Sequence, residues 1–152
     1  MSNLLIQNAT MLLPETTVVG DLLIENGVIS TIQPGGGLVA SDDVRTIDAT
    51  GLHLLPGLID PQVHFRDPGQ PEKEDLYTGS CAAASGGITS FLDMPNNVPS
   101  QTTLQSMHEK IATGNRRCVT NFGFFIGATE SNVDELKKAV RTPETPIAIL
   151  GI

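Results

Sequence analysis

The stretch DPQVHFRDPG at residues 60–69 decides the fold of this chain, and it follows an apolar run, LLPGLI, at residues 54–59. A short apolar run bounded by proline and glycine predicts a strand that leads into the core. Residues two apart project from the same face of a strand, so we expect positions 60, 62, 64 and 66 to project together. The polar residues in this stretch are therefore candidates for a functional site.

A pair of imidazoles at positions 62 and 64 would clamp a divalent cation, but only one of the two is present. His64 is a candidate metal ligand, whereas Gln62 stands at its partner's position and offers zinc a weaker ligand. Arg66 is a candidate for binding an anionic substrate. A lone histidine on an apolar strand is more often a satisfied core or surface residue, so the assignment depends on the rest of the chain.

After residue 56, strands alternate with helices. We predict strands at 57–65, 89–94, 119–126 and 146–152, and helices at 73–85, 102–113 and 132–141. This alternation is typical of a TIM barrel, which needs eight βα units and about 250 residues. We therefore expect an α/β chain with about three and a half units of a truncated barrel. A doubly wound open sheet is the structural alternative, but it does not explain a metal-type motif at the end of the first strand.

Local signals predict where the helices begin and end. Residues 73–75, KED, are predicted to begin the first helix, since acidic groups are favourable at its N-terminus, and Gly86-Gly87 to end it. Ser131 is predicted to cap the third helix, with Asp134 in its first turn. The predicted buried face of that helix consists of Val133, Leu136 and Val140.

Residues 3 to about 55 have a different pattern, with short β segments separated by turns. The segments lie at 4–6, 21–25, 28–32 and 44–47. Asn26-Gly27 predicts a type I′ hairpin, because both residues tolerate positive φ. Three glycines at 35–37 predict a surface turn, because no Lys-Ser/Thr or helix start follows them as in a phosphate loop. We expect a small β-sandwich segment at 1–55, followed by the barrel segment at 56–152.

Composition excludes several classes of protein. The net charge is −8 and no basic run occurs, so nucleic acid is not an expected partner. No apolar run is long enough to span a membrane, and Met1-Ser2-Asn3 lacks the basic start of a signal peptide. Cys81 and Cys118 are too few for a disulfide framework and are expected to be reduced core thiols. We therefore expect a cytoplasmic protein.

Four blocks of sequence occur in order: PGLIDPQVHFRDPG at 56–69, KED at 73–75, GGIT at 86–89 and MPNN at 94–97. In this order and at these separations they resemble the dihydroorotase branch of the metal-dependent amidohydrolases. The resemblance runs across essentially all 152 residues, as an N-terminal portion of a longer family member.

The resemblance implies reversible ring closure of N-carbamoyl-L-aspartate to dihydroorotate, with one or two zinc ions that activate water. It implies that Arg66 and Asn96 hold the substrate carboxylate and that Asp60 can orient the metal site. The family's remaining site residues are a bridging carboxylate, often a carbamylated lysine, two further histidines and a catalytic aspartate. None of them lies in this chain. We therefore expect no catalytic residue within it, and no stable zinc binding, because Gln62 leaves His64 without its partner.

Three functions remain open for the longer protein. The first is an active dihydroorotase, which His64, Arg66 and Asn96 favour. The second is a non-catalytic scaffold that forms a homodimer or partners aspartate transcarbamoylase, which Gln62 favours. The third is an allantoinase or a dihydropyrimidinase-type hydrolase, which Arg66 disfavours, because relatives of this kind act on uncharged cyclic amides.

Overall fold

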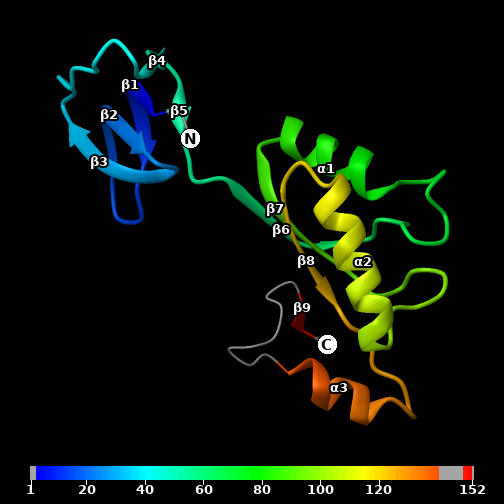
Figure 1. Ribbon diagram of the computed structural model, residues 1–152. Coiled ribbons are helices and arrows are strands. Elements are labelled where there is room, and N and C mark those ends of the chain that lie inside the picture. The colour runs from blue at the N-terminus through cyan, green and yellow to red at the C-terminus, as the bar shows by residue number, and fades with distance from the viewer. Residues whose placement is uncertain (1–2, 141–148, 152) are drawn as a thin grey trace. The chain divides into compact units, whose positions relative to one another are not determined.

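A computed structural model describes residues 3–140 and 149–151 (Figure 1). The chain divides into two compact units, Met1–Pro56 and Gly57–Ile152. The first is a β unit and the second alternates strands with helices. No helix among the described residues is long and apolar enough to cross a membrane.

The first unit contains one five-stranded mixed sheet. Its strands are β1 (Leu4–Leu12), β2 (Thr17–Glu25), β3 (Val28–Pro34), β4 (Arg45–Asp48) and β5 (His53–Leu54). Their order is β3-β2-β1-β4, with β5 also paired to β1. The antiparallel pairs are β1–β2 and β2–β3, whereas β4 and β5 run parallel to β1. Because the described part of this unit forms a single sheet, the second layer of a sandwich stays a prediction.

Glycine-containing turns connect these strands. Asn26 and Gly27 have φ values of 54° and 82° and join Glu25 to its cross-strand partner Val28, so the two-residue hairpin is confirmed. Residues 35–37 all have positive φ and are followed by irregular chain before β4, as a surface turn requires. The core of this unit consists of Ala9, Met11, Leu22 and Ala49.

In the described residues, the second unit is a parallel four-stranded sheet with three helices. Figure 1 shows how these elements alternate along the chain. Its elements are β6 (Leu58–Val63), α1 (Leu76–Ser85), β7 (Ile88–Asp93), α2 (Leu104–Arg117), β8 (Asn121–Phe125), α3 (Val133–Ala139) and β9 (Ile149–Gly151). The strand order β6-β7-β8-β9 follows the sequence, and every neighbouring pair is parallel. The predicted βα alternation is confirmed. Its core consists of Leu76, Phe91, Met107, Phe124, Ile126, Ala139 and Ile149.

Helix α1 begins three residues later than predicted. Asp75 is its N-cap, and the Asp75 side chain accepts a hydrogen bond from Thr78 N at 2.7 Å. Because the cap residue itself is non-helical, residues 73–74 precede the helix instead of forming its first turn. Gly86 is the C-cap and Gly87 has a φ of 81°, so the two glycines end the helix as predicted.

The predicted cap of α3 is wrong, and of its predicted buried face only Leu136 packs against the core. Its N-cap is Asn132, and the Asn132 side chain donates instead to the carbonyls of Thr102 and Gly127, both at 2.8 Å. Ser131 is exposed and does not cap. The residues of α3 that join the core are Leu136 and Ala139, whereas Val133 and Val140 are exposed.

Several other helix and strand bounds also differ from the sequence prediction. Helix α2 continues to Arg117, four residues beyond the predicted end, and Cys118 is its C-cap. The fourth predicted strand, 146–152, is represented by β9 at Ile149–Gly151, and residues 146–148 lie outside the described residues.

Candidate functional site

The candidate site lies where β6 and β7 end. These strands are parallel neighbours, with Val63 opposite Asp93 at their carboxyl ends. Met94 N donates to Val63 O at 3.0 Å, so pairing continues one residue past β7. The segments 64–66 and 94–97 therefore leave the sheet next to each other, although 30 residues separate them in sequence.

His64 and Asn96 meet at this edge. His64 Nδ1 lies 3.0 Å from Asn96 Oδ1. An amide oxygen only accepts, so Nδ1 is the donor in this contact, and in the neutral imidazole Nε2 then keeps its lone pair. Both residues are exposed in this unit. The segments 64–66 and 94–97 thus meet through a direct side-chain contact, and a neutral His64 held in this way could ligate a metal through Nε2.

Arg66 occupies a backbone loop with two hydrogen bonds. Arg66 N donates to Glu74 O, and Arg66 O accepts from Gln70 N, both at 2.8 Å. These bonds fold the segment between β6 and α1 back on itself. The Arg66 side chain is half-buried, and its guanidinium forms no hydrogen bond or ion pair with any residue that the structure describes. It is therefore free to bind an anion.

Asp60 and Gln62 do not join His64 and Arg66 on one face, as two-residue alternation along a strand predicted. Strand β6 ends at Val63, so positions 64 and 66 lie in the following loop and two-residue alternation no longer applies to them. The register also shifts between Asp60 and Val63. Asp60 Oδ1 accepts from Gln62 N at 3.1 Å. Within the described residues, neither side chain forms a hydrogen bond to His64.

The described residues do not by themselves fit a zinc ion. Among residues 3–140 and 149–151, no three His, Cys, Asp or Glu side chains gather closely enough to hold a metal. Near the end of β6, His64 is the one imidazole, and Gln62 supplies an amide in place of the second. A zinc site in proteins has at least three protein ligands.

A buried polar group lies beneath the exposed residues of the site. Asp93 Oδ2 is 2.7 Å from Lys110 Nζ on α2, and both side chains are fully buried. Asp93 Oδ1 accepts from Phe65 N at 2.9 Å. Asn97 accepts from Lys110 Nζ at 2.7 Å and donates through Nδ2 to Phe65 O at 3.1 Å. Phe65 is the residue between His64 and Arg66.

Burial perturbs both ionisable members of this group. Desolvation raises the pKa of Asp93, and the nearby Lys110 ammonium opposes that rise. Desolvation likewise lowers the pKa of Lys110, against the attraction of Asp93. The sequence analysis missed Asp93, Asn97 and Lys110 as parts of the site. The available signal was the spacing of Lys110, which lies three residues after the buried Met107 and so on the same face of the helix. Because lysine is rarely buried unless paired, this spacing indicates a buried polar partner.

Other polar residues near these elements have structural roles or lie apart. Lys73 Nζ donates to Gln70 Oε1 at 3.2 Å, and Asp75 caps α1. His108 is exposed on α2, and His53 is exposed on β5 of the first unit. None of them joins His64.

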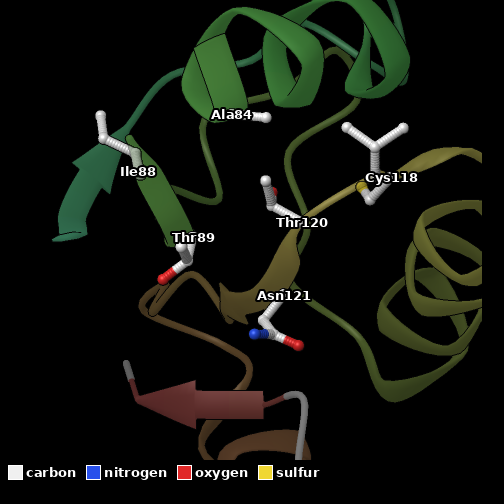
Figure 2. A pocket seen from close by; sticks show the side chains of 7 residues that line it. Ala84, Ile88, Thr89, Cys118, Thr120 and Asn121 are labelled. Carbon is white, nitrogen blue, oxygen red and sulfur yellow. The ribbon is translucent and has the colours of Figure 1, made fainter. Parts of the chain in front are cut away.

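A pocket of about 450 Å³ lies at the opposite edge of the sheet, where β7 and β8 begin (Figure 2). It is lined by Ala84, Ile88, Thr89, Cys118, Val119, Thr120 and Asn121. Burial raises the pKa of the Cys118 thiol to about 11, so this thiol is protonated and unreactive at neutral pH. Both Cys118 and Cys81 are free and half-buried, and Cys118 packs against the core.

Comparison with known proteins agrees with this architecture. Residues 53–146 match the model of the amidohydrolase family, which is more than half of the chain. The chain therefore belongs to the amidohydrolase family. The resemblance to dihydroorotases is confirmed as well: the chain is 38% identical over 141 residues to a dihydroorotase of Methanosarcina acetivorans, an alignment that covers 93% of this chain and 30% of that protein.

Allantoinases and hydantoinases are also similar. The chain is 36% identical over 135 residues to an allantoinase of Deinococcus radiodurans, covering 88% of this chain and 30% of that protein. An L-hydantoinase (dihydropyrimidinase) structure from Arthrobacter aurescens aligns with the whole chain at a TM-score of 0.83 and 25% identity, covering 36% of that protein. This likeness confirms the barrel fold of the amidohydrolases. The chain spans about a third of the length of these relatives.

Proposed function

We propose that the protein to which this chain belongs is a cytoplasmic dihydroorotase, which interconverts N-carbamoyl-L-aspartate and dihydroorotate in pyrimidine biosynthesis. The observation that carries the proposal is the unpaired guanidinium of Arg66 at the carboxyl end of β6. Each of these substrates carries a carboxylate beside the reacting amide. A planar guanidinium binds a carboxylate through two parallel hydrogen bonds, which an ammonium cannot form.

Asn96 supplies a second contact to the same carboxylate. Its Oδ1 faces His64 Nδ1, so its amide NH₂ is directed away from the imidazole and can donate to the substrate. Arg66 and Asn96 then bind one anionic group from two neighbouring loops. Binding from two sides fixes the orientation of the ring as well as its position.

The chain supplies substrate-binding residues and one metal ligand, but no catalytic residue. His64 Nε2 is the ligand that it contributes to a zinc site in the whole protein. Because Gln62 leaves that site one imidazole short, we propose that this chain alone is inactive and that zinc binds stably only when further ligands join His64.

The other candidate functions make different demands on Arg66. A hydrolase that opens uncharged cyclic amides, as the hydantoinase and allantoinase relatives suggest, has no use for a free guanidinium at this place. A non-catalytic scaffold that forms a homodimer or docks aspartate transcarbamoylase has no physical reason to keep both Arg66 and Asn96. Gln62 is the observation that favours the scaffold.

The proposal is tested in the full-length protein with Gln62→His, loaded with zinc. We expect turnover of dihydroorotate to exceed that of hydantoin and allantoin. Adding Arg66→Lys keeps the charge but removes the bidentate geometry, so the KM for dihydroorotate should rise by about tenfold. Turnover of hydantoin or allantoin that exceeds turnover of dihydroorotate would identify the uncharged-substrate class. A zinc-loaded protein that turns over none of them would support the scaffold.

A further inference from the structure

Phe65 is held through both of its backbone polar groups. Its N–H donates to Asp93 Oδ1 at 2.9 Å, and its carbonyl accepts from Asn97 Nδ2 at 3.1 Å. Backbone groups in a loop usually find water or a neighbouring strand. Here the two partners are buried side chains, Asp93 at the end of β7 and Asn97 just beyond it, in place of water or a strand. Phe65, in the loop after β6, is therefore held by β7 and the segment that follows it.

Lys110 fixes the two side chains that hold Phe65. Its Nζ lies 2.7 Å from Asp93 Oδ2 and 2.7 Å from Asn97 Oδ1, and it faces the Phe124 ring at 4.7 Å from the centroid. Because the ammonium takes one oxygen of each partner, it determines which atoms remain for Phe65: the other carboxylate oxygen and the amide NH₂. A single cation thus sets the orientation of an acceptor and a donor.

The ring of Phe65 is fixed as well. Its centroid is 4.8 Å from that of Phe91 in an edge-to-face arrangement. On the other side it lies so close to Gly79 of α1 that a Cβ at position 79 would come within 2.5 Å of the ring. Backbone and side chain are therefore both immobilised, and the residues on either side of Phe65 inherit that constraint.

We propose that Lys110, Asp93 and Asn97 are positioning residues for the candidate site, which act through the backbone of Phe65. His64 and Arg66 flank Phe65 directly, so the peptide planes that carry their side chains share its hydrogen bonds. Helix α2 thereby contributes to the site without touching substrate. This proposal rests on the proposed function only for the roles of His64 and Arg66.

A purely structural role for the group is the simpler alternative, and energetics separates the two. A buried ion pair loses much of its attraction to desolvation, and replacing such a pair with apolar side chains is often neutral for stability. A merely structural pair can therefore be exchanged without local consequence. A positioning group cannot, because the N–H of Phe65 would lose its acceptor.

Two double variants of the full-length protein form a matched test. Asp93→Asn/Lys110→Met removes both charges but keeps an oxygen for Phe65 N–H. Asp93→Leu/Lys110→Met also removes both charges and leaves no acceptor. The asparagine and leucine side chains have the same branching and the same number of heavy atoms, so the main difference between the two variants is the oxygen that accepts from Phe65 N–H.

The first measurement is amide hydrogen exchange at Phe65 by NMR, which needs no activity. We expect protection within about threefold of the parent in the asparagine variant and at least about tenfold lower protection in the leucine variant, with the amides of β8 unchanged. Equal protection in the two variants would overturn the proposal. If the leucine variant does not fold, Asn97→Asp takes its place in the test. This substitution keeps an oxygen for Lys110 but removes the donor to Phe65 O. Unchanged amide exchange at Arg66 in this variant would overturn the proposal.

The second measurement is steady-state kinetics in the Gln62→His background. We expect the leucine variant to raise the KM for dihydroorotate by about tenfold, and the asparagine variant to stay within about threefold. If the Gln62→His parent shows no turnover, the result counts against the proposed function. The amide exchange at Phe65 then tests the positioning group by itself. A tenfold loss in both kinetic variants, with Phe65 protected in both, would show that charge rather than position matters and would overturn the proposal.

Discussion

Lys110 Nζ and Asp93 Oδ2 form an ion pair of 2.7 Å in which both side chains are fully buried. The lysine comes from the middle of α2 and the aspartate from the last position of β7. The pair thus joins a helix of the outer layer to the end of the sheet where the candidate site lies. Because the pair is fully buried and also contacts Phe65 N and Asn97, Lys110 and Asp93 are the first residues to mutate.

We expect Lys110→Met to lower the free energy of unfolding by about 3–5 kcal/mol, because it leaves the Asp93 carboxylate buried without a partner. Urea denaturation measures the change. Desolvation already raises the pKa of Asp93, so the stability attached to its protonated form is present at acidic pH and is lost as the pH rises through the folded-state pKa. The variant should therefore be least impaired at low pH. In the control, Asp93→Asn/Lys110→Met, which keeps an oxygen for Phe65 N–H, most of the loss should be recovered; a double variant no more stable than the single one would contradict this account.

The adjacent asparagines should respond differently to alanine. Asn97 is buried and serves Lys110 and Phe65, so Asn97→Ala is expected to cost about 1–3 kcal/mol of stability. Asn96 is exposed and contacts the His64 imidazole, so Asn96→Ala should change stability by less than about 0.5 kcal/mol. Thermal denaturation compares them. Equal losses would show that the division of roles between the two residues is wrong.

Stability should fall between pH 9 and pH 11 because of Cys118. Burial raises the pKa of this thiol from 9.0 to about 11, so the folded protein keeps a proton that the unfolded chain releases. Stability linked to that proton is present below pH 9 and lost as the pH rises to 11, by about 1 kcal/mol, because solvent screening at this half-buried thiol reduces the effect of the shift. The matched variants are Cys118→Ala and Cys81→Ala: the first should flatten the decline and the second should not. A decline that is identical in both variants would assign it to other groups.

Zinc uptake should depend on position 62. After exhaustive dialysis, elemental analysis of this chain is expected to find well under one zinc per molecule, since His64 has no second imidazole beside it. In the full-length protein, Gln62→His should raise the zinc content, whereas His108→Ala should leave it unchanged, because His108 lies exposed on α2. Stoichiometric zinc in a protein that retains Gln62 would refute the role assigned to this residue.

The order of helices and strands was predictable from sequence, because it depends on the spacing of apolar residues and on the residues that begin and end each element. Apolar runs and Gly86-Gly87 predicted the helices and strands that the structure describes in the second unit, although not the cap of α3. The end of β6 was not predictable to the residue, and this matters because His64 lies one position beyond it. A two-residue period predicts facing side chains only while the strand continues.

The support beneath the site could not be predicted from sequence. Its hydrogen bonds and ion pair join residues 13 to 32 positions apart, so they depend on how β6, β7 and α2 pack. Asn132 illustrates the same limit at α3. Its side chain spans two carbonyls from other parts of the unit, and this tertiary use displaced the local cap that Ser131 offered.

The close approach of Gly79 to the Phe65 ring has a consequence for how homologous sequences can vary. Any side chain at position 79 would push against a ring that has no room to move, because Phe91 packs against it and the backbone of Phe65 is held at both ends. A larger residue at 79 therefore requires a smaller one at 65, so the two positions should change together. Across a set of aligned relatives, residues 65 and 79 are expected to covary, although one lies in a loop and the other in a helix.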